Sequence, residues 1–231
     1  MLPEFVLGLD LAQSGDWSAL VAVERHGGPP ADPDADAYDL LHIERWQGES
    51  YAAVPDRVRR VAERLRLLAA ERVYARRGAA RPSDAAAEIT LVVDATGVGA
   101  AVVDLLRQAD LAPVPIVIHG GDAVGRDGHG GYRVPKRDLV SVLQVLLQGR
   151  RLRVAEGLPE AAILTRELAA FRVKITASGH DSYGAGGGDL EWRERPHDDI
   201  VLATALAAWY ARWATPPRLT LDVLAYWGQG P

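Results

Sequence analysis

Two short apolar runs, each closed by an aspartate, constrain the fold of this chain more than any other feature. Residues 5–9 precede Asp10, and residues 91–93 precede Asp94. Because neither run offers a polar face to water, each is typical of a central strand covered on both sides. We therefore expect an α/β domain in which helices cover both faces of a central sheet. Asp10 and Asp94 would lie at the sheet edge, where open α/β folds bind ligands.

A third acidic position lies late in the chain. Asp198 and Asp199 open the apolar helical run 200–213, and His197 precedes them. Acids in the first turn of a helix commonly serve as caps. Asp199, however, shares a helical face with apolar residues, so its carboxylate is expected to point into the protein. Asp198 is rotated by about 100° around the helix axis from Asp199, and is expected either to contact a metal ion or to cap the helix.

Acids from two strand ends and one helix are expected to form a single cluster. Like charges so close together raise one another's pKa unless cations neutralise them. Mg²⁺ or Mn²⁺ suits such oxygen ligands, and phosphodiester cleavage is the chemistry that follows. His197 is a candidate metal ligand, proton carrier or orienting partner. The ordinary alternatives are a turn at Asp10 and a capped strand–helix turn at Asp94, with Thr96 as the cap.

Composition excludes several classes of protein. The chain has no cysteine, which excludes disulfides, thiolate metal sites and a cysteine nucleophile. Its 231 residues suffice for one substantial core, which we place in a domain over 1–214 followed by a tail over 215–231. No segment resembles a signal peptide or a membrane span, so a cytoplasmic protein is expected. A net charge of −5 argues against a simple nucleic-acid coat but not against an enzyme.

The predicted elements give a mixed sheet of about five strands, three antiparallel and then two parallel, with helices on both faces. Hydrophobic periodicity and turn signals predict these elements in the first half of the chain. They are strands over 4–11, 17–25 and 38–46, a helix over 54–77, a strand over 89–94, a helix over 97–108 and a strand over 114–118.

The second half alternates in the same way after a glycine-rich segment over 119–132, which is expected to be a mobile loop. The predicted elements are a helix over 134–148, a strand over 151–154, a helix over 159–169, a hairpin of strands 171–176 and 190–195 around a loop, and a helix over 200–213. The loop, over 178–188, is a candidate lid for the cleft.

Four stretches of the sequence, which contain these acids or lie between them, form a characteristic combination. They are Leu9-Asp10-Leu11-Ala12 with Gly15-Asp16-Trp17-Ser18-Ala19-Leu20, Val93-Asp94-Ala95-Thr96-Gly97-Val98-Gly99, Val134-Pro135-Lys136-Arg137-Asp138-Leu139 and Pro196-His197-Asp198-Asp199. In this order they resemble the ribonuclease H-like fold, and in particular the C-terminal nuclease domain of phage terminase large subunits. The resemblance runs from about Phe5 to Trp213.

The resemblance implies a metal-dependent endonuclease that cleaves double-stranded DNA during genome packaging. It implies that Asp10, Asp94 and Asp199 bind two Mg²⁺ or Mn²⁺ ions, with Asp198 as a fourth acid. Besides double-stranded DNA, the expected partners are a separate packaging ATPase, the portal and the small terminase subunit. The chain contains no Gly-x-x-x-x-Gly-Lys-Ser/Thr phosphate loop, so we expect an excised domain or a free-standing relative.

Four basic residues are candidate contacts to DNA. Lys136 opens a predicted helix near the acids and is expected to contact the scissile phosphate, to orient a metal ligand or to transfer a proton. An ordinary exposed lysine is the alternative. Arg126, Arg133 and Arg137 lie in or beside the glycine-rich segment. Nothing in the sequence suggests that bases are read, so phosphate contacts and little sequence preference are expected.

Two other classes of protein remain open at this point. An actin-like or sugar-kinase-like ATP-binding fold also has an acid after its first strand and a turn like residues 94–97. Such proteins clamp the nucleotide between two domains, whereas this chain is about one domain long. The other class is a catalytically idle DNA-binding module of the same fold, against which the intact set of acids argues.

Overall fold

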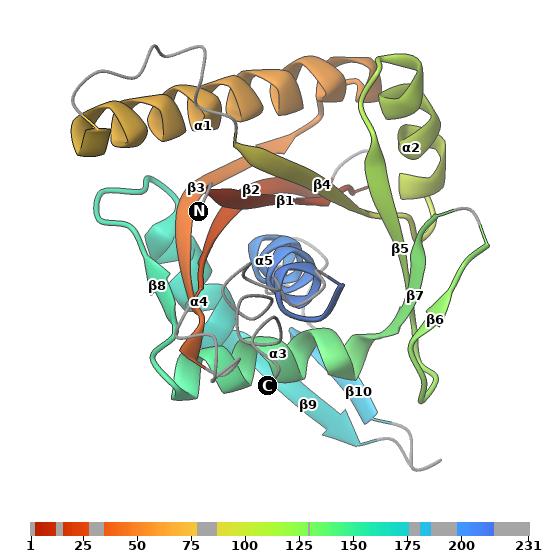
Figure 1. The fold of residues 1–231 in the computed structure, drawn as a ribbon. Helices are drawn as coiled ribbons and strands as arrows, with labels where there is room; N and C mark the ends of the chain where they lie inside the picture. Colours follow the sequence, from red (N-terminus) through yellow and green to blue (C-terminus); the bar gives the residue numbers. More distant parts are fainter. Residues whose placement is uncertain are drawn as a thin grey trace, which may run out of the picture.

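The computed structural model describes residues 3–12, 16–27, 35–77, 87–128, 130–175, 181–185 and 198–214. Their main sheet has eight strands in the order β6-β7-β5-β4-β1-β2-β3-β8 (Figure 1). The strands are β1 (Glu4–Asp10), β2 (Trp17–His26), β3 (Ala37–Gln47), β4 (Glu88–Asp94), β5 (Pro113–His119), β6 (Gly125–Arg126), β7 (Tyr132–Pro135) and β8 (Leu152–Val154).

Helices cover both faces of this sheet, as the sequence predicts. The helices are η2 (Tyr51–Ala53), α1 (Val54–Arg77), α2 (Gly99–Gln108), α3 (Lys136–Gln148), α4 (Ala161–Ala170) and α5 (Asp199–Trp209), which continues into the π-helical turn η5 (Tyr210–Ala214). Figure 1 shows α1 and α2 on one side, and α5 on the other with α3 and α4 beyond it.

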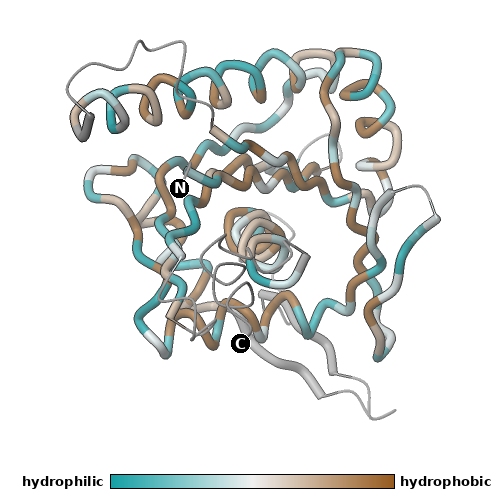
Figure 2. The backbone as a smooth tube through the Cα atoms, viewed as in Figure 1, coloured by the Kyte–Doolittle hydropathy of each residue, from teal (hydrophilic) through white to brown (hydrophobic). Residues whose placement is uncertain are grey.

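The central strand β1 is buried on both faces because its alternate side chains enter two separate cores. Phe5, Leu7 and Leu9 pack with α1 and α2, whereas Val6 packs with α5. Hydrophobic residues accordingly run along the central strands and around α5 (Figure 2). β1 pairs in antiparallel fashion with β2 and in parallel with β4. The three-stranded antiparallel start and the adjacency of the first and fourth strands are therefore confirmed.

Glycine at position 8 lets α5 lie directly against β1. A Cβ atom built on Gly8 would lie 2.1 Å from the carbonyl oxygen of Ala203 and 3.1 Å from the Cβ of Ala207. The group that approaches Gly8 is therefore the backbone of α5. α5 is thereby held over β1 and β2, with its first turn toward the end of β1 that carries Asp10.

The sheet is larger than predicted, because three short strands extend its edges. β7 pairs in parallel with β5, β6 pairs with β7, and β8 pairs in parallel with β3. The predicted helix over 134–148 is wrong at its start: Val134 and Pro135 belong to β7, and the helix begins at Lys136. The prediction of a loop throughout 119–132 is also wrong, because strand β6 lies inside this range.

The segment predicted as the loop of the late hairpin contains a strand. β9 (Phe171–Ile175) pairs with β10 (Asp181–Ala185), and the predicted second strand over 190–195 lies outside the described residues. Pairing across the shorter connection closes a smaller loop at a lower cost in chain entropy. Part of the segment predicted as a lid is therefore strand β10. The predicted tail over 215–231 also lies outside the described residues.

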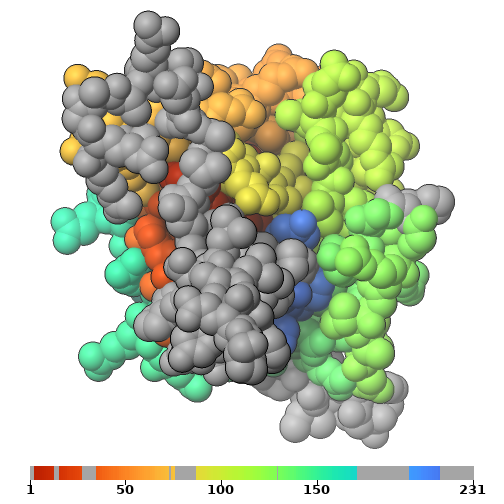
Figure 3. Space-filling view, in the orientation of Figure 1, coloured from red at the N-terminus to blue at the C-terminus, as the bar shows by residue number. Residues whose placement is uncertain are grey.

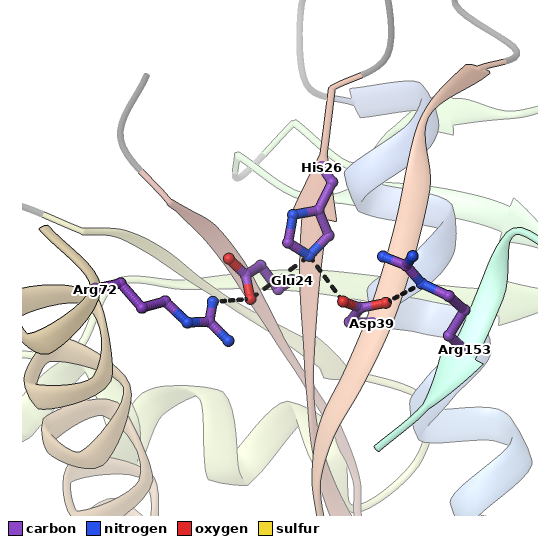
Figure 4. A network of polar contacts seen from close by, with 5 residues as sticks. All are labelled: Glu24, His26, Asp39, Arg72 and Arg153. Atoms are coloured by element: carbon purple, nitrogen blue, oxygen red, sulfur yellow. Dashed lines mark hydrogen bonds and ion pairs between the residues drawn. The ribbon is translucent and has the colours of Figure 1, made fainter. Parts of the chain in front are cut away.

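A polar network links the strands at the end of the sheet away from Asp10 (Figure 4). Glu24 pairs with Arg72, and the Nε2 atom of His26 lies 3.6 Å from Glu24 and 2.9 Å from Asp39. Arg153 on β8 pairs with Asp39 at 2.5 Å. These contacts join α1, β2, β3 and β8. We therefore infer that the network stabilises this end of the sheet.

No helix in the described part of the chain is long and apolar enough to cross a membrane.

Candidate metal centre

Asp10 and Asp94 lie side by side because their strands run in parallel and end together. Leu9 on β1 stands opposite Val93 on β4, so the next residue of each strand is its aspartate. Strand alternation places Asp10 on the same face as Val6 and Gly8, which is the face that α5 covers. Both carboxylates thus lie at one end of the sheet, near the start of α5.

The electrostatics of Asp10 show that the four acids converge. Burial raises the pKa of the Asp10 carboxyl well above its usual value. The negative charges of Asp94, Asp199 and Asp198 raise this pKa further, and the positive charge of Lys136 lowers it. The structure thus brings together the four acids that the sequence singles out, and the like charges around Asp10 are incompletely compensated.

Asp94 is held by the turn that follows it. Its Oδ1 atom accepts a hydrogen bond of 2.8 Å from the backbone N–H of Thr96. Burial raises the pKa of Asp94, while hydrogen bonds from Thr96 and the charge of Lys136 lower it. The prediction that Thr96 caps the next helix is wrong. Its hydroxyl accepts from the backbone N–H of Ile118, 2.9 Å away on β5, and the residue that precedes α2 is Val98.

Asp199 is buried and bound to an arginine that sequence reasoning missed. The Nη2 atom of Arg45 on β3 donates to Asp199 Oδ2 at 2.9 Å and lies 3.8 Å from Glu167 Oε1. The Arg45 side chain is only 8% exposed, and its guanidinium carbon lies 4.3 Å from the ring centre of Trp17. The register of the sheet brings this arginine to the cluster, because Arg45 stands opposite Ala19, which stands opposite Asp10.

Glu167 on α4 is the second residue that the sequence analysis missed. Its Oε2 atom accepts from the backbone N–H groups of Ile200 and Val201, at 3.0 and 3.1 Å. Burial raises the pKa of Glu167 to about 7, Asp199 also raises it, and Arg45 and the two N–H groups oppose this. Glu167 therefore satisfies the donors at the buried start of α5, which a helix cannot satisfy by itself.

Asp198 does not cap α5 with its side chain. It precedes the helix, but its carboxylate accepts no capping hydrogen bond. Its Oδ2 atom lies instead 3.4 Å from the Nζ atom of Lys136. Of the two roles that the sequence allows for Asp198, capping is therefore wrong. Lys136 lies among the acids, as the sequence predicts.

The contacts of the other candidate residues that the structure describes are with partners outside the acid cluster. His197 lies outside the described residues. Arg126 stacks on the ring of Tyr132, 4.0 Å from its centre, and Arg133 on β7 is exposed. Arg137 donates to the side chain of Asp122 at 2.6 Å and to its backbone carbonyl at 2.8 Å. In the space-filling view, atoms of α5 lie beside the green segment that contains β5 to β7 (Figure 3).

The donor set suits Mg²⁺ or Mn²⁺, but its oxygens do not form a preformed cage. Among the described residues, no group of three or more acid, histidine or cysteine side chains is placed to hold one ion. Arg45, Lys136 and the N–H of Thr96 each bind one of the acids. The fit lies in the oxygen chemistry of the cluster and in the unbalanced negative charge around Asp10.

The raised pKa of Asp10 predicts that Asp10→Asn stabilises the metal-free protein. The folded chain holds a proton on Asp10 at a pH where the unfolded chain has released it, so the wild type loses stability as the pH rises above the ordinary carboxyl range. The gain from Asp10→Asn should therefore be largest near pH 7 and shrink as the pH falls. Each kcal/mol gained raises the melting temperature by about 2 to 4 °C.

Melting curves of both proteins with a metal chelator, from pH 8 to pH 4, measure this effect. Burial lowers the pKa of His42, so protonation of His42 destabilises both proteins as the pH falls. This effect is common to the two proteins, so the difference between their melting temperatures reports Asp10 alone. A lower melting temperature for Asp10→Asn at pH 7 would show that Asp10 is a structural hydrogen-bonding partner.

The fold and the cluster together define a ribonuclease H-like α/β domain. Three antiparallel strands are followed by parallel ones, and acids lie at the ends of β1 and β4 and at the start of a late helix. The chain belongs to the family described as the terminase RNaseH-like domain, which matches residues 7–211. The fold and family that the sequence analysis inferred are thus confirmed.

Two solved structures are similar to this chain over most of its length. The large terminase nuclease from thermophilic phage G20c superposes with a TM-score of 0.53 and 21% identity, covering 90% of this chain and 82% of that one. The same nuclease with bound cobalt gives a TM-score of 0.54 and 22% identity, covering 89% and 80%. At this level of identity the likeness shows the fold alone. No curated protein matches the chain.

Proposed function

We propose that this chain is a metal-dependent endonuclease that hydrolyses double-stranded DNA with little sequence preference. The observation that carries the proposal is the position of Asp10 and Asp94 at the ends of the paired strands β1 and β4, with Asp198 and Asp199 near enough to raise the pKa of Asp10. Membership of a terminase RNaseH-like family supports it. The same membership removes the basis for an actin-like or sugar-kinase-like ATP-binding domain.

The four aspartates would hold two Mg²⁺ or Mn²⁺ ions. When bound, such a pair supplies a hydroxide at neutral pH and stabilises the leaving 3′ oxygen. The cobalt-bound form of the phage G20c nuclease supports a divalent cation in this chain. Asp10 and Asp94 would hold the ions from the strand ends, while Asp198 and Asp199 would hold them from the start of α5.

Basic residues near the acids would bind the DNA backbone. Lys136, whose Nζ atom lies 3.4 Å from Asp198 Oδ2 at the start of α3, would contact the scissile phosphate. Arg126, Arg133 and Arg137 follow along β6, β7 and α3 and would contact neighbouring phosphates. His197 would orient a ligand or carry a proton. Because these contacts are to phosphate, affinity should fall steeply as salt rises.

The proposed setting is the packaging of phage DNA. Partners there would be double-stranded DNA, a separate packaging ATPase, the portal and the small terminase subunit. The chain itself has no ATP-binding phosphate loop, so it would cut DNA that another component moves.

Incubation of supercoiled plasmid with the protein and Mn²⁺ tests the proposal directly. Nicked and then linear DNA should appear, with cuts spread over the plasmid, and a chelator should stop the reaction. Plasmid that stays supercoiled at high protein concentration with either Mn²⁺ or Mg²⁺ would contradict the proposal. Retarded but uncut plasmid in that experiment would favour the idle DNA-binding module.

A further inference from the structure

Resting on the proposed function, we infer that Arg45 and Glu167 are positioning residues of the acid cluster. Arg45 fixes the carboxylate of Asp199, and Glu167 fixes the backbone from which Asp199 projects. Neither residue is among the acids that would bind metal, and they come from elements that contribute no such acid, β3 and α4.

Arg45 reaches the cluster because of the sheet register. Asp10, Ala19 and Arg45 are paired in sequence across β1, β2 and β3. Directly opposed residues of antiparallel strands point to the same face, so Arg45 points to the face that α5 covers. From there its Nη2 atom reaches Asp199 at 2.9 Å. Arg45 thus ties the start of α5 to the sheet on the side away from Asp94.

The guanidinium of Arg45 is itself held in place from two sides. The ring of Trp17 lies against it at 4.3 Å, and the Oε1 atom of Glu167 lies 3.8 Å from its Nη2 atom. Burying a charge is costly unless it is paired, and Arg45 has two carboxylates as partners. A side chain fixed in this way offers Asp199 a hydrogen bond in one direction, and so sets the direction of the carboxylate.

Glu167 does for α5 what a capping side chain normally does. Asp198 stands at the capping position but makes no such bond, and Glu167 accepts from both Ile200 and Val201 instead. Its carboxylate therefore fixes the first turn of α5, and with it the backbone of Asp199. It also leaves the carboxylate of Asp198 beside Lys136 and Asp10.

Two conservative variants test the inference through metal affinity. Glu167→Gln keeps one acceptor but loses the charge, and Arg45→Lys keeps the charge but loses the planar fork of donors. Partners that orient metal ligands typically change metal affinity by about 10- to 100-fold. We expect each variant to bind Mn²⁺ about 10- to 100-fold more weakly than the wild type, by calorimetric titration of the full chain at a temperature where it is folded.

The network of Figure 4 provides matched controls. Glu24 and Glu167 are each buried acids with 5% of the side chain exposed, and each has an arginine partner. Glu24→Gln and Arg72→Lys should lower the melting temperature in a similar way and leave Mn²⁺ affinity within about twofold of the wild type. If Arg45→Lys or Glu167→Gln does not fold, Trp17→Leu removes only the ring beneath Arg45 and should also weaken Mn²⁺ binding.

The outcomes separate this inference from the proposed function. Wild-type affinity for Mn²⁺ in Arg45→Lys and Glu167→Gln, in a chain that binds Mn²⁺ and cuts DNA, would overturn the inference and leave the function standing. Tighter Mn²⁺ binding by Arg45→Lys would also overturn it, because the hydrogen bonds of the guanidinium would then hinder metal binding by Asp199 instead of orienting it. A wild type that neither binds Mn²⁺ nor cuts DNA would overturn the proposed function, and the inference with it.

Discussion

Asp10→Asn is expected to abolish DNA cleavage, with a loss well beyond 100-fold, in a protein that still folds. Asp10 is the residue on which the other three acids converge, and it lies at the end of a central strand that is fixed on both faces. Outer partners of a metal site account for about 10- to 100-fold in activity, so the loss of a direct ligand should exceed that range. Asp94→Asn should behave in the same way.

The plasmid assay with Mn²⁺ measures the loss, and Asp39→Asn is a suitable control. Asp39 is also an aspartate on a strand of the same sheet, but it belongs to the network at the other end and pairs with Arg153. Cleavage by Asp10→Asn at a rate near that of Asp39→Asn would remove Asp10 from the active site. The folded state of each variant is checked by its melting curve.

Gly8→Ala is expected to lower the free energy of unfolding more than the addition of one methyl group at any other position of β1. The new Cβ would lie 2.1 Å from the carbonyl oxygen of Ala203 and 3.0 Å from the carbonyl carbon. These are backbone atoms of a buried helix, so they cannot rotate away, and α5 must move off the sheet. We expect a loss of about 3 kcal/mol or more, and hence a melting temperature lower by roughly 6 to 12 °C.

Gly120→Ala is the matched control for this substitution, because a Cβ atom there meets nothing within 4 Å. The two variants change the unfolded chain in the same way, so their difference reports the contact with α5. Cleavage should fall in Gly8→Ala as well, since α5 carries Asp198 and Asp199. Equal melting temperatures for the two variants would mean that α5 does not pack against β1 as described.

Sequence patterns predict the elements whose signal lies within one segment. The helical repeat over 54–77 gives α1 with its observed ends, and the apolar run before Asp10 gives a central strand. The position of the acids follows from the same reasoning, because an acid that closes a buried strand must lie where the strands of the sheet end. These are local regularities that tertiary packing reinforces.

The missed features depend on contacts between distant segments. Arg45 lies among alternating polar residues of β3 and reads as an ordinary solvated charge, and its partner Asp199 is 154 positions away. Glu167 reads as a surface residue of an amphipathic helix until α5 is docked against it. Thr96 has the sequence of a cap, but the neighbouring strand β5 offers its hydroxyl an N–H group first. β7 is too short to show a strand pattern of its own.

The cluster draws its acids from opposite ends of the described chain, and this sets when it is complete during synthesis on the ribosome. Asp10 is made early, whereas α5 follows every strand of the main sheet. At typical translation rates of about 5 to 20 residues per second, roughly 10 to 40 s pass between them. A nascent chain therefore carries no complete acid cluster until α5 has been made and has docked against the sheet.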